Sequence, residues 1–157
     1  MFRPVLILAL MLPLLLPVSC NKAWRGDGPP SVLEKSVWIG TNQARNEILE
    51  LRFGFEGDVS RVESEDGSTV ETGRMEMVFH SPADTVMYEG TYSYRRWPSS
   101  VSGDVFHGSA DMKLTEADTG ESVNVEMTFH NQRFFISFRG SSYPADRAED
   151  SWISNVQ

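Results

Sequence analysis

Residues 86–94 read VMYEGTYSY and contain the pattern that decides the fold. Every second position, from Val86 to Tyr94, is hydrophobic or glycine, and polar residues such as Glu89 and Thr91 lie between them. Successive side chains of a β-strand point to opposite faces, so this alternation places one set in a core and the other toward solvent. The stretch therefore predicts a half-buried β-strand.

The same period of two recurs from Ser36 onward and predicts an all-β chain. The connections are short and rich in Gly, Asp and Asn, which makes consecutive strands antiparallel neighbours. About eight such strands form an antiparallel meander, and closing it into a barrel removes the free edges. A sandwich of two sheets is the alternative, although it would usually need longer crossovers. The strands are expected near residues 37–41, 47–55, 59–63, 75–79, 86–94, 106–114, 123–129 and 133–139, with the third having the weakest alternation.

The pattern changes after Gly140. Pro144 is followed by Asp146, Glu149 and Asp150, and proline and acidic residues favour the first turn of a helix. A short C-terminal helix is therefore expected, which Trp152 could pin against the barrel wall.

The N-terminus has the layout of an export signal. Arg3 precedes an apolar run over residues 5–16, which is shorter than the roughly 20 residues of a membrane-spanning helix. Val18 and Ser19, directly before Cys20, resemble a bacterial lipobox, although Pro17 stands where an aliphatic residue is usual. The resemblance implies cleavage before Cys20 and acylation of its thiol. The alternative is an unpaired thiol just past an ordinary secretory cleavage site.

These features divide the chain into three parts: a lipoprotein signal peptide over residues 1–19, a lipid anchor and flexible linker over 20–35, and a β-barrel domain over 36–157. Gly26, Gly28 and Pro30 lie in the linker, where such residues are common. Two or more acyl chains hold a protein stably on a membrane. Asn21 follows the cysteine, and in the lipoproteins that this resembles, aspartate there favours inner-membrane retention. The expected location is the bacterial cell envelope, at the outer membrane rather than the inner.

Charge and motifs narrow the classes of function. The formal net charge is −8, and an acidic surface repels phosphate backbones, so no nucleic-acid partner is expected. No serine stands in a nucleophile motif such as G-x-S-x-G, and the carboxylates mostly occupy the polar faces of strands. We expect neither an enzyme nor a cofactor.

The first strand contains Trp38-Ile39-Gly40, and Arg139 ends the last predicted strand. With these residues the region from about Val37 to Arg139 resembles the lipocalin-like (calycin) family, although Ser36 stands where a glycine is usual. In that family a first-strand tryptophan packs under an arginine of the last strand, so the resemblance implies that Trp38 and Arg139 close one end. Leu51-Arg52-Phe53, and the tyrosines spaced around Gly90, look like lipocalin-like lipoproteins of gut-type Gram-negative bacteria.

The interior face supplies the first functional hypothesis. Tyrosine is amphipathic, and methionine lines adaptable pockets, so the inward set fits a cavity for a small apolar or aromatic ligand. The alternative is a filled core, since an eight-stranded barrel is narrow enough for side chains to fill it. The candidate ligand-binding residues are Tyr88, Tyr92, Tyr94, Met75, Met77 and Met127.

Arg95, Arg96 and Trp97 supply the second hypothesis. They form a basic aromatic patch on an acidic chain, which suits a contact surface. The leading hypothesis is thus that the chain is a lipid-anchored, non-catalytic envelope protein that binds a small ligand. The alternative is an accessory or interaction subunit of an envelope assembly, with a filled barrel that docks through this patch.

The three histidines are candidate metal ligands. His80 and His130 should lie at opposite ends of the meander. If Met112 faces Val125, however, His107 falls opposite His130, where Asp104 could add a third ligand. His130 also suits a tight turn, and no metal site is assigned.

Overall fold

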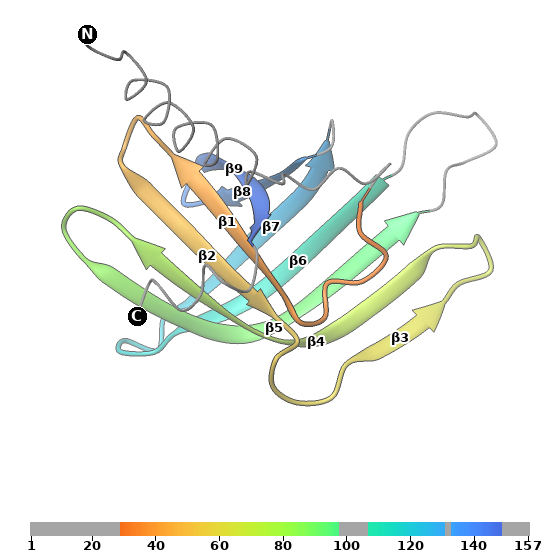
Figure 1. The fold of residues 1–157 in the computed structure, drawn as a ribbon. Coiled ribbons are helices and arrows are strands. Elements are labelled where there is room, and N and C mark those ends of the chain that lie inside the picture. Colours follow the sequence, from red (N-terminus) through yellow and green to blue (C-terminus); the bar gives the residue numbers. More distant parts are fainter. Residues whose placement is uncertain (1–28, 98–106, 131–132, 149–157) are drawn as a thin grey trace, which may run out of the picture.

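The computed structural model describes residues 29–97, 107–130 and 133–148. These residues contain no helix that is long and apolar enough to cross a membrane. Their regular structure is entirely antiparallel β-sheet (Figure 1). The strands are β1 Ser36–Asn42, β2 Glu47–Phe53, β3 Ser60–Glu63, β4 Thr69–His80, β5 Thr85–Trp97, β6 His107–Glu116, β7 Ser122–His130, β8 Arg133–Phe138 and β9 Ser141–Ala148.

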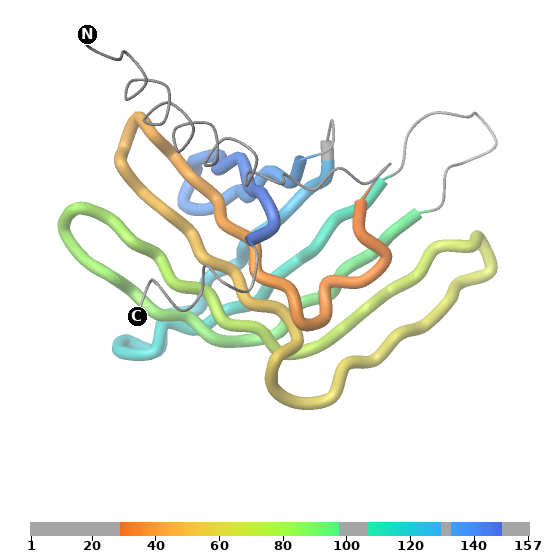
Figure 2. Tube along the Cα trace, in the orientation of Figure 1, coloured from red at the N-terminus to blue at the C-terminus, as the bar shows by residue number. Residues whose placement is uncertain are grey.

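Eight of these strands close into a ring, which confirms the predicted lipocalin-like barrel. The order is β2-β1-β9-β8-β7-β6-β5-β4, and β2 pairs with β4 to complete the circle. The Cα trace in Figure 2 follows this meander around the barrel. β3 pairs only with β4 and lies outside the ring. The predicted third strand therefore exists, but β9 takes the eighth place in the barrel.

The helix predicted from Pro144 is wrong for residues 144–148, which belong to β9. Tyr143 and Ala145 face the core and are fully buried, so the period is two here as elsewhere. Pro144 comes just before the residues that pair with β1, where Ala145 faces Gly40, so its missing N–H removes no bond to that strand. Trp152 lies outside the described residues.

β4 pairs along one edge with two different strands, while its other edge pairs with β5. Its second half pairs with β2, and its first half pairs with β3 in a hairpin that extends away from the barrel (Figure 1). Gly54, with a positive φ of 66°, turns the chain out of β2, and its N–H donates to the Arg74 carbonyl at 2.9 Å. Phe55 continues the apolar alternation of Leu49, Leu51 and Phe53, which predicts a core position, but after this turn it is 41% exposed.

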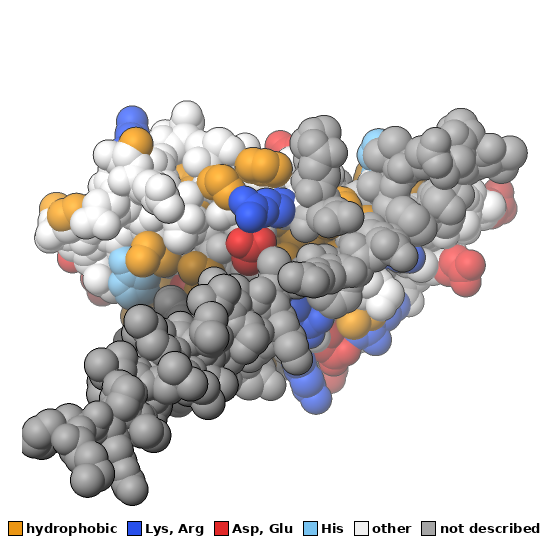
Figure 3. Space-filling model, turned by 45° about the horizontal axis from the view of Figure 1, so that its top comes forward, with side chains coloured by type: hydrophobic (Ala, Val, Ile, Leu, Met, Phe, Trp, Pro, Cys, Tyr) orange, Lys and Arg blue, Asp and Glu red, His pale blue; other side chains and the backbone are white. Residues whose placement is uncertain are grey.

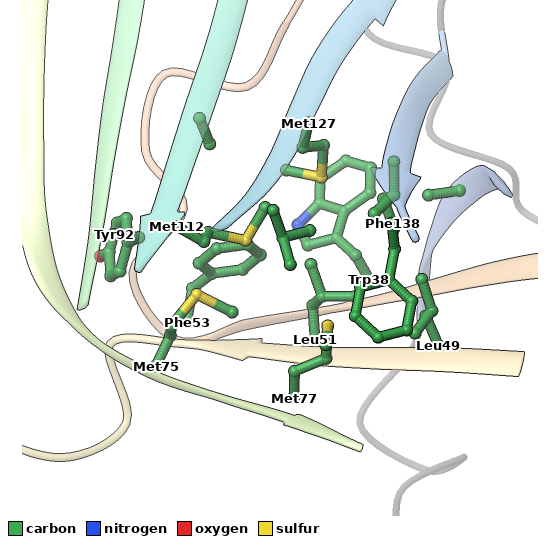
Figure 4. Close-up of a cluster of buried hydrophobic side chains, with 14 of the residues drawn as sticks. Trp38, Leu49, Leu51, Phe53, Met75, Met77, Tyr92, Met112, Met127 and Phe138 are labelled. Carbon is green, nitrogen blue, oxygen red and sulfur yellow. The ribbon is translucent and has the colours of Figure 1, made fainter. Parts of the chain in front are cut away.

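The barrel interior is filled with apolar side chains. Methionines from β4, β6 and β7 lie among aromatic rings and leucines that point toward one another (Figure 4). Trp38 meets Phe134 edge to face at 4.7 Å, and Phe53 meets Tyr92 at 5.0 Å between ring centroids. Such pairs add to the free energy gained from burial alone.

Residues 29–35, here called the strap, pack against the barrel although the sequence predicts a linker up to residue 35. Leu33 is fully buried and belongs to the core cluster. The Lys35 N–H donates to the Phe53 carbonyl at 2.7 Å, which ties the strap to β2. Pro30 accepts a hydrogen bond from Tyr94, near the end of β5, and Pro29 lies beside Gly108, near the start of β6. The strap (orange in Figure 1) therefore lies at this end of the barrel.

Candidate functional site

The predicted ligand-binding residues all lie inside the barrel, where each is at most 3% exposed. Their tyrosine hydroxyls are bonded within the chain. Tyr88 accepts a hydrogen bond from an Arg139 Nη at 2.7 Å. Tyr92 donates to Glu71 at 2.8 Å, and Tyr94 donates to the Pro30 carbonyl at 2.6 Å. The buried tyrosines therefore have the partners that such hydroxyls need without any ligand.

Burial also fixes the protonation of these tyrosines. Desolvation raises the pKa of Tyr92 and of Tyr94 well above the ordinary value, and the hydrogen bond to Glu71 adds to the rise at Tyr92. Burial, followed by the hydrogen bond to Glu47, raises the pKa of Tyr143 to about 12. Tyrosine is already neutral at physiological pH, and these shifts extend the range of the neutral hydroxyl to more alkaline pH.

Glu71 is a buried carboxylate that the sequence reading did not single out. It is 3% exposed, and its Oε2 accepts from the Leu33 N–H at 3.0 Å as well as from Tyr92. Its Oε1 accepts from Arg61 Nε at 3.1 Å, and Arg61 also pairs with Glu34 of the strap. Extending the alternation of β4 back from Met75 would have placed Glu71 on the inner face. This carboxylate joins the strap, β3, β4 and β5.

The predicted contact between Trp38 and Arg139 is not made. The register places Trp38 beside Arg147 of β9, near the start of β8, whereas Arg139 follows the end of β8. Arg139 instead lies over the Phe79 and Phe138 rings, at 5.6 and 5.1 Å.

Ser36, at the position where the resemblance expects glycine, holds the tryptophan in place. It accepts from Trp38 Nε1 at 3.0 Å and donates to the Leu33 carbonyl. Trp38 is thus tied to the strap, and Arg139 caps the opposite end of the barrel.

The basic aromatic patch divides into two faces. Arg95 is exposed, and its guanidinium lies 5.7 Å from the ring centroid of the half-buried Trp97. Arg96 points to the other side, where its Nε donates to the Pro29 carbonyl at 3.1 Å. Arg95 and Trp97 therefore form the solvent-facing part, and Arg96 helps to hold the strap.

A groove of about 430 Å³ lies on the outer wall of the barrel. Of the six predicted ligand-binding residues, only Met75 lines it. Its walls come from β2, β4, β5, β6 and the turn after β2. We call it the outer-wall groove, and its polar and aromatic lining includes Arg52, Phe55, Arg74, Glu76, Glu89 and Thr115.

The histidines form no metal centre among the residues that the structure describes, where no group of three or more His, Cys, Asp or Glu side chains could hold an ion. The assumed register is confirmed, since Met112 pairs with Val125. His107 begins β6 and is exposed. Asp104 and the side chain of His130 lie outside the described part. His80 Nε2 lies 3.9 Å from Glu50 Oε2, beyond hydrogen-bond distance.

One face of the molecule is shown in Figure 3. Charged side chains of both signs are scattered among hydrophobic ones on this face. Comparison with known proteins found no matching family model, no matching curated protein and no matching solved structure.

Proposed function

We propose that this chain is a lipid-anchored protein of the bacterial cell envelope that acts by binding through its outer surface, without catalysis. The observation that best supports binding through the outer surface is the filled interior. The tyrosines proposed as ligand-binding residues form hydrogen bonds within the chain itself. A ligand inside the barrel would have to displace packed side chains, at a cost of several kcal/mol. The filled barrel favours the accessory or interaction role over the interior ligand.

Membrane attachment would concentrate such a surface near its partner. The lipobox resemblance at Cys20 supports this attachment, and the sequence around Asn21 favours the outer membrane. Binding energy then need not come from one large interface, because tethering raises the effective concentration.

Replacing Cys20 by alanine should move the protein from the membrane fraction to the soluble fraction. Without the thiol no acyl chain can be attached, and the acidic domain gains little from anionic lipids. Fractionation followed by immunoblotting measures this, with Ser93→Ala as a control that leaves the cysteine intact. Retention of the Cys20 variant in the membrane fraction would contradict the anchoring proposal.

Arg95 and Trp97 form the candidate contact with a protein partner. A photo-crosslinking amino acid at position 95 should give a discrete adduct in whole cells, whereas one at Asn124, exposed on β7, should not. Trp97→Ala should lower the yield of the adduct several-fold, since aromatic residues beside arginine often carry much of an interface's energy. Equal adducts at both positions, or none at position 95, would count against this surface.

A further inference from the structure

We infer that the outer-wall groove binds a zwitterion, a small molecule or headgroup that carries an ammonium group and an anionic group a few ångströms apart. This goes beyond the proposed function and does not depend on it. The groove's volume of about 430 Å³ falls in the range of small-ligand sites, about 300–1,000 Å³.

The strand register builds a row of charges across the groove. Arg52 of β2 faces Glu76 of β4, Glu76 faces Glu89 of β5, and Glu89 faces Thr115 of β6. Two like charges directly opposite each other on an antiparallel pair are destabilising. Neither Glu76 nor Glu89 has an ion pair with any residue that the structure describes. The pair offers two carboxylates to an ammonium group.

Arg52 supplies the opposite end. Its guanidinium lies over the exposed Phe55 ring, 4.9 Å from the centroid, although Glu76 is its cross-strand neighbour. Its Nε is buried and has no hydrogen-bond partner among the described residues. A buried donor left unpaired costs free energy and so needs an explanation. An anionic group of a ligand at this position would accept that hydrogen bond and pair with the cation.

Arg74 adds a second cation beside Arg52. Its side chain packs against the turn at Gly57, where its Cδ would lie 3.2 Å from a Cβ built on the glycine. This contact packs the stem against the turn, and Arg74 also lines the groove.

The net charge and the spacing select the ligand. The lining contains two arginines and three glutamates, counting Glu56, which disfavours a purely anionic ligand such as a nucleotide. Neighbouring strands are about 4.8 Å apart, so the backbones at Arg52 and Glu89, two strands apart, are about 10 Å from each other. Side chains that extend into the groove from both of these strands would therefore match a ligand whose opposite charges lie a few ångströms apart. The exposed Phe55 ring provides apolar surface for the rest of the ligand.

Titration calorimetry with the purified protein tests this with a dipeptide. Glycyl-phenylalanine should bind with a Kd in the millimolar range or tighter. Its N-acetyl derivative lacks the ammonium group and its amide lacks the carboxylate, so each should bind at least about tenfold more weakly. Glycerophosphoethanolamine presents the same two charges as a lipid headgroup. Tighter binding of this compound would identify a headgroup as the source of the zwitterion.

Two substitutions locate the binding. Glu89→Gln should weaken zwitterion binding about tenfold, while the matched Glu126→Gln, exposed on β7, should leave it unchanged. Circular dichroism confirms that each variant folds. The proposal is overturned if neither zwitterion binds, if blocking the charges has no effect, or if Glu89→Gln binds as well as the unmodified protein.

Discussion

Gly90→Ala is expected to be the most damaging single-methyl addition in the barrel, with a loss of at least about 3 kcal/mol in the free energy of unfolding. A Cβ at this position would lie 2.0 Å from the Lys113 carbonyl oxygen and 3.0 Å from the Leu114 Cα. Both are backbone atoms of β6, so no side chain can rotate away. Relief requires that β5 and β6 separate near the Tyr88–Glu116 end of their ladder.

Urea denaturation followed by tryptophan fluorescence, to which the buried Trp38 contributes, measures this loss. Gly120→Ala is the matched control, because it has open space around its Cβ but a positive φ of 72°. That backbone strain alone should cost about 1–2 kcal/mol. If Gly90→Ala costs no more than Gly120→Ala, the close approach of the two strands at Gly90 is not needed for the fold.

Much of the fold could be predicted because alternation is a local signal. Tyr88, Tyr92 and Tyr94 could be assigned to the inner face from period alone, and the short turns fixed their antiparallel order. β9 was missed because Pro144 and the acids after it outweigh a two-residue period carried only by Tyr143 and Ala145. A local signal cannot reveal that this segment is needed to close the ring.

The candidate sites depended on information that the sequence does not contain. Phe55 continues the apolar alternation of β2, and only the turn at Gly54 moves it to the outer wall. Arg52 and Glu89 are distant in the chain, and the register of three strands places them two strands apart at the groove. The strap has the composition of a linker, and its burial follows from Glu71 and Tyr94 at the barrel end.

Glu71→Ala is expected to release the strap and to lower the free energy of unfolding by about 3 kcal/mol. The substitution leaves two buried donors unpaired, the Leu33 N–H and the Tyr92 hydroxyl. It also removes the carboxylate that accepts a hydrogen bond from Arg61 of β3. Glu71→Gln retains one acceptor oxygen and should therefore cost less.

Hydrogen exchange separates release of the strap from general loss of stability. The Leu33 amide should exchange much faster in Glu71→Ala, whereas amides of the β6–β7 ladder should change only as far as global stability falls. A double-mutant cycle with Tyr92→Phe should give a coupling of about 1 kcal/mol or more, since both side chains share one hydrogen bond. Unchanged protection at Leu33 would mean that the strap is held by its apolar contacts, and that Glu71 serves only β3 and Tyr92.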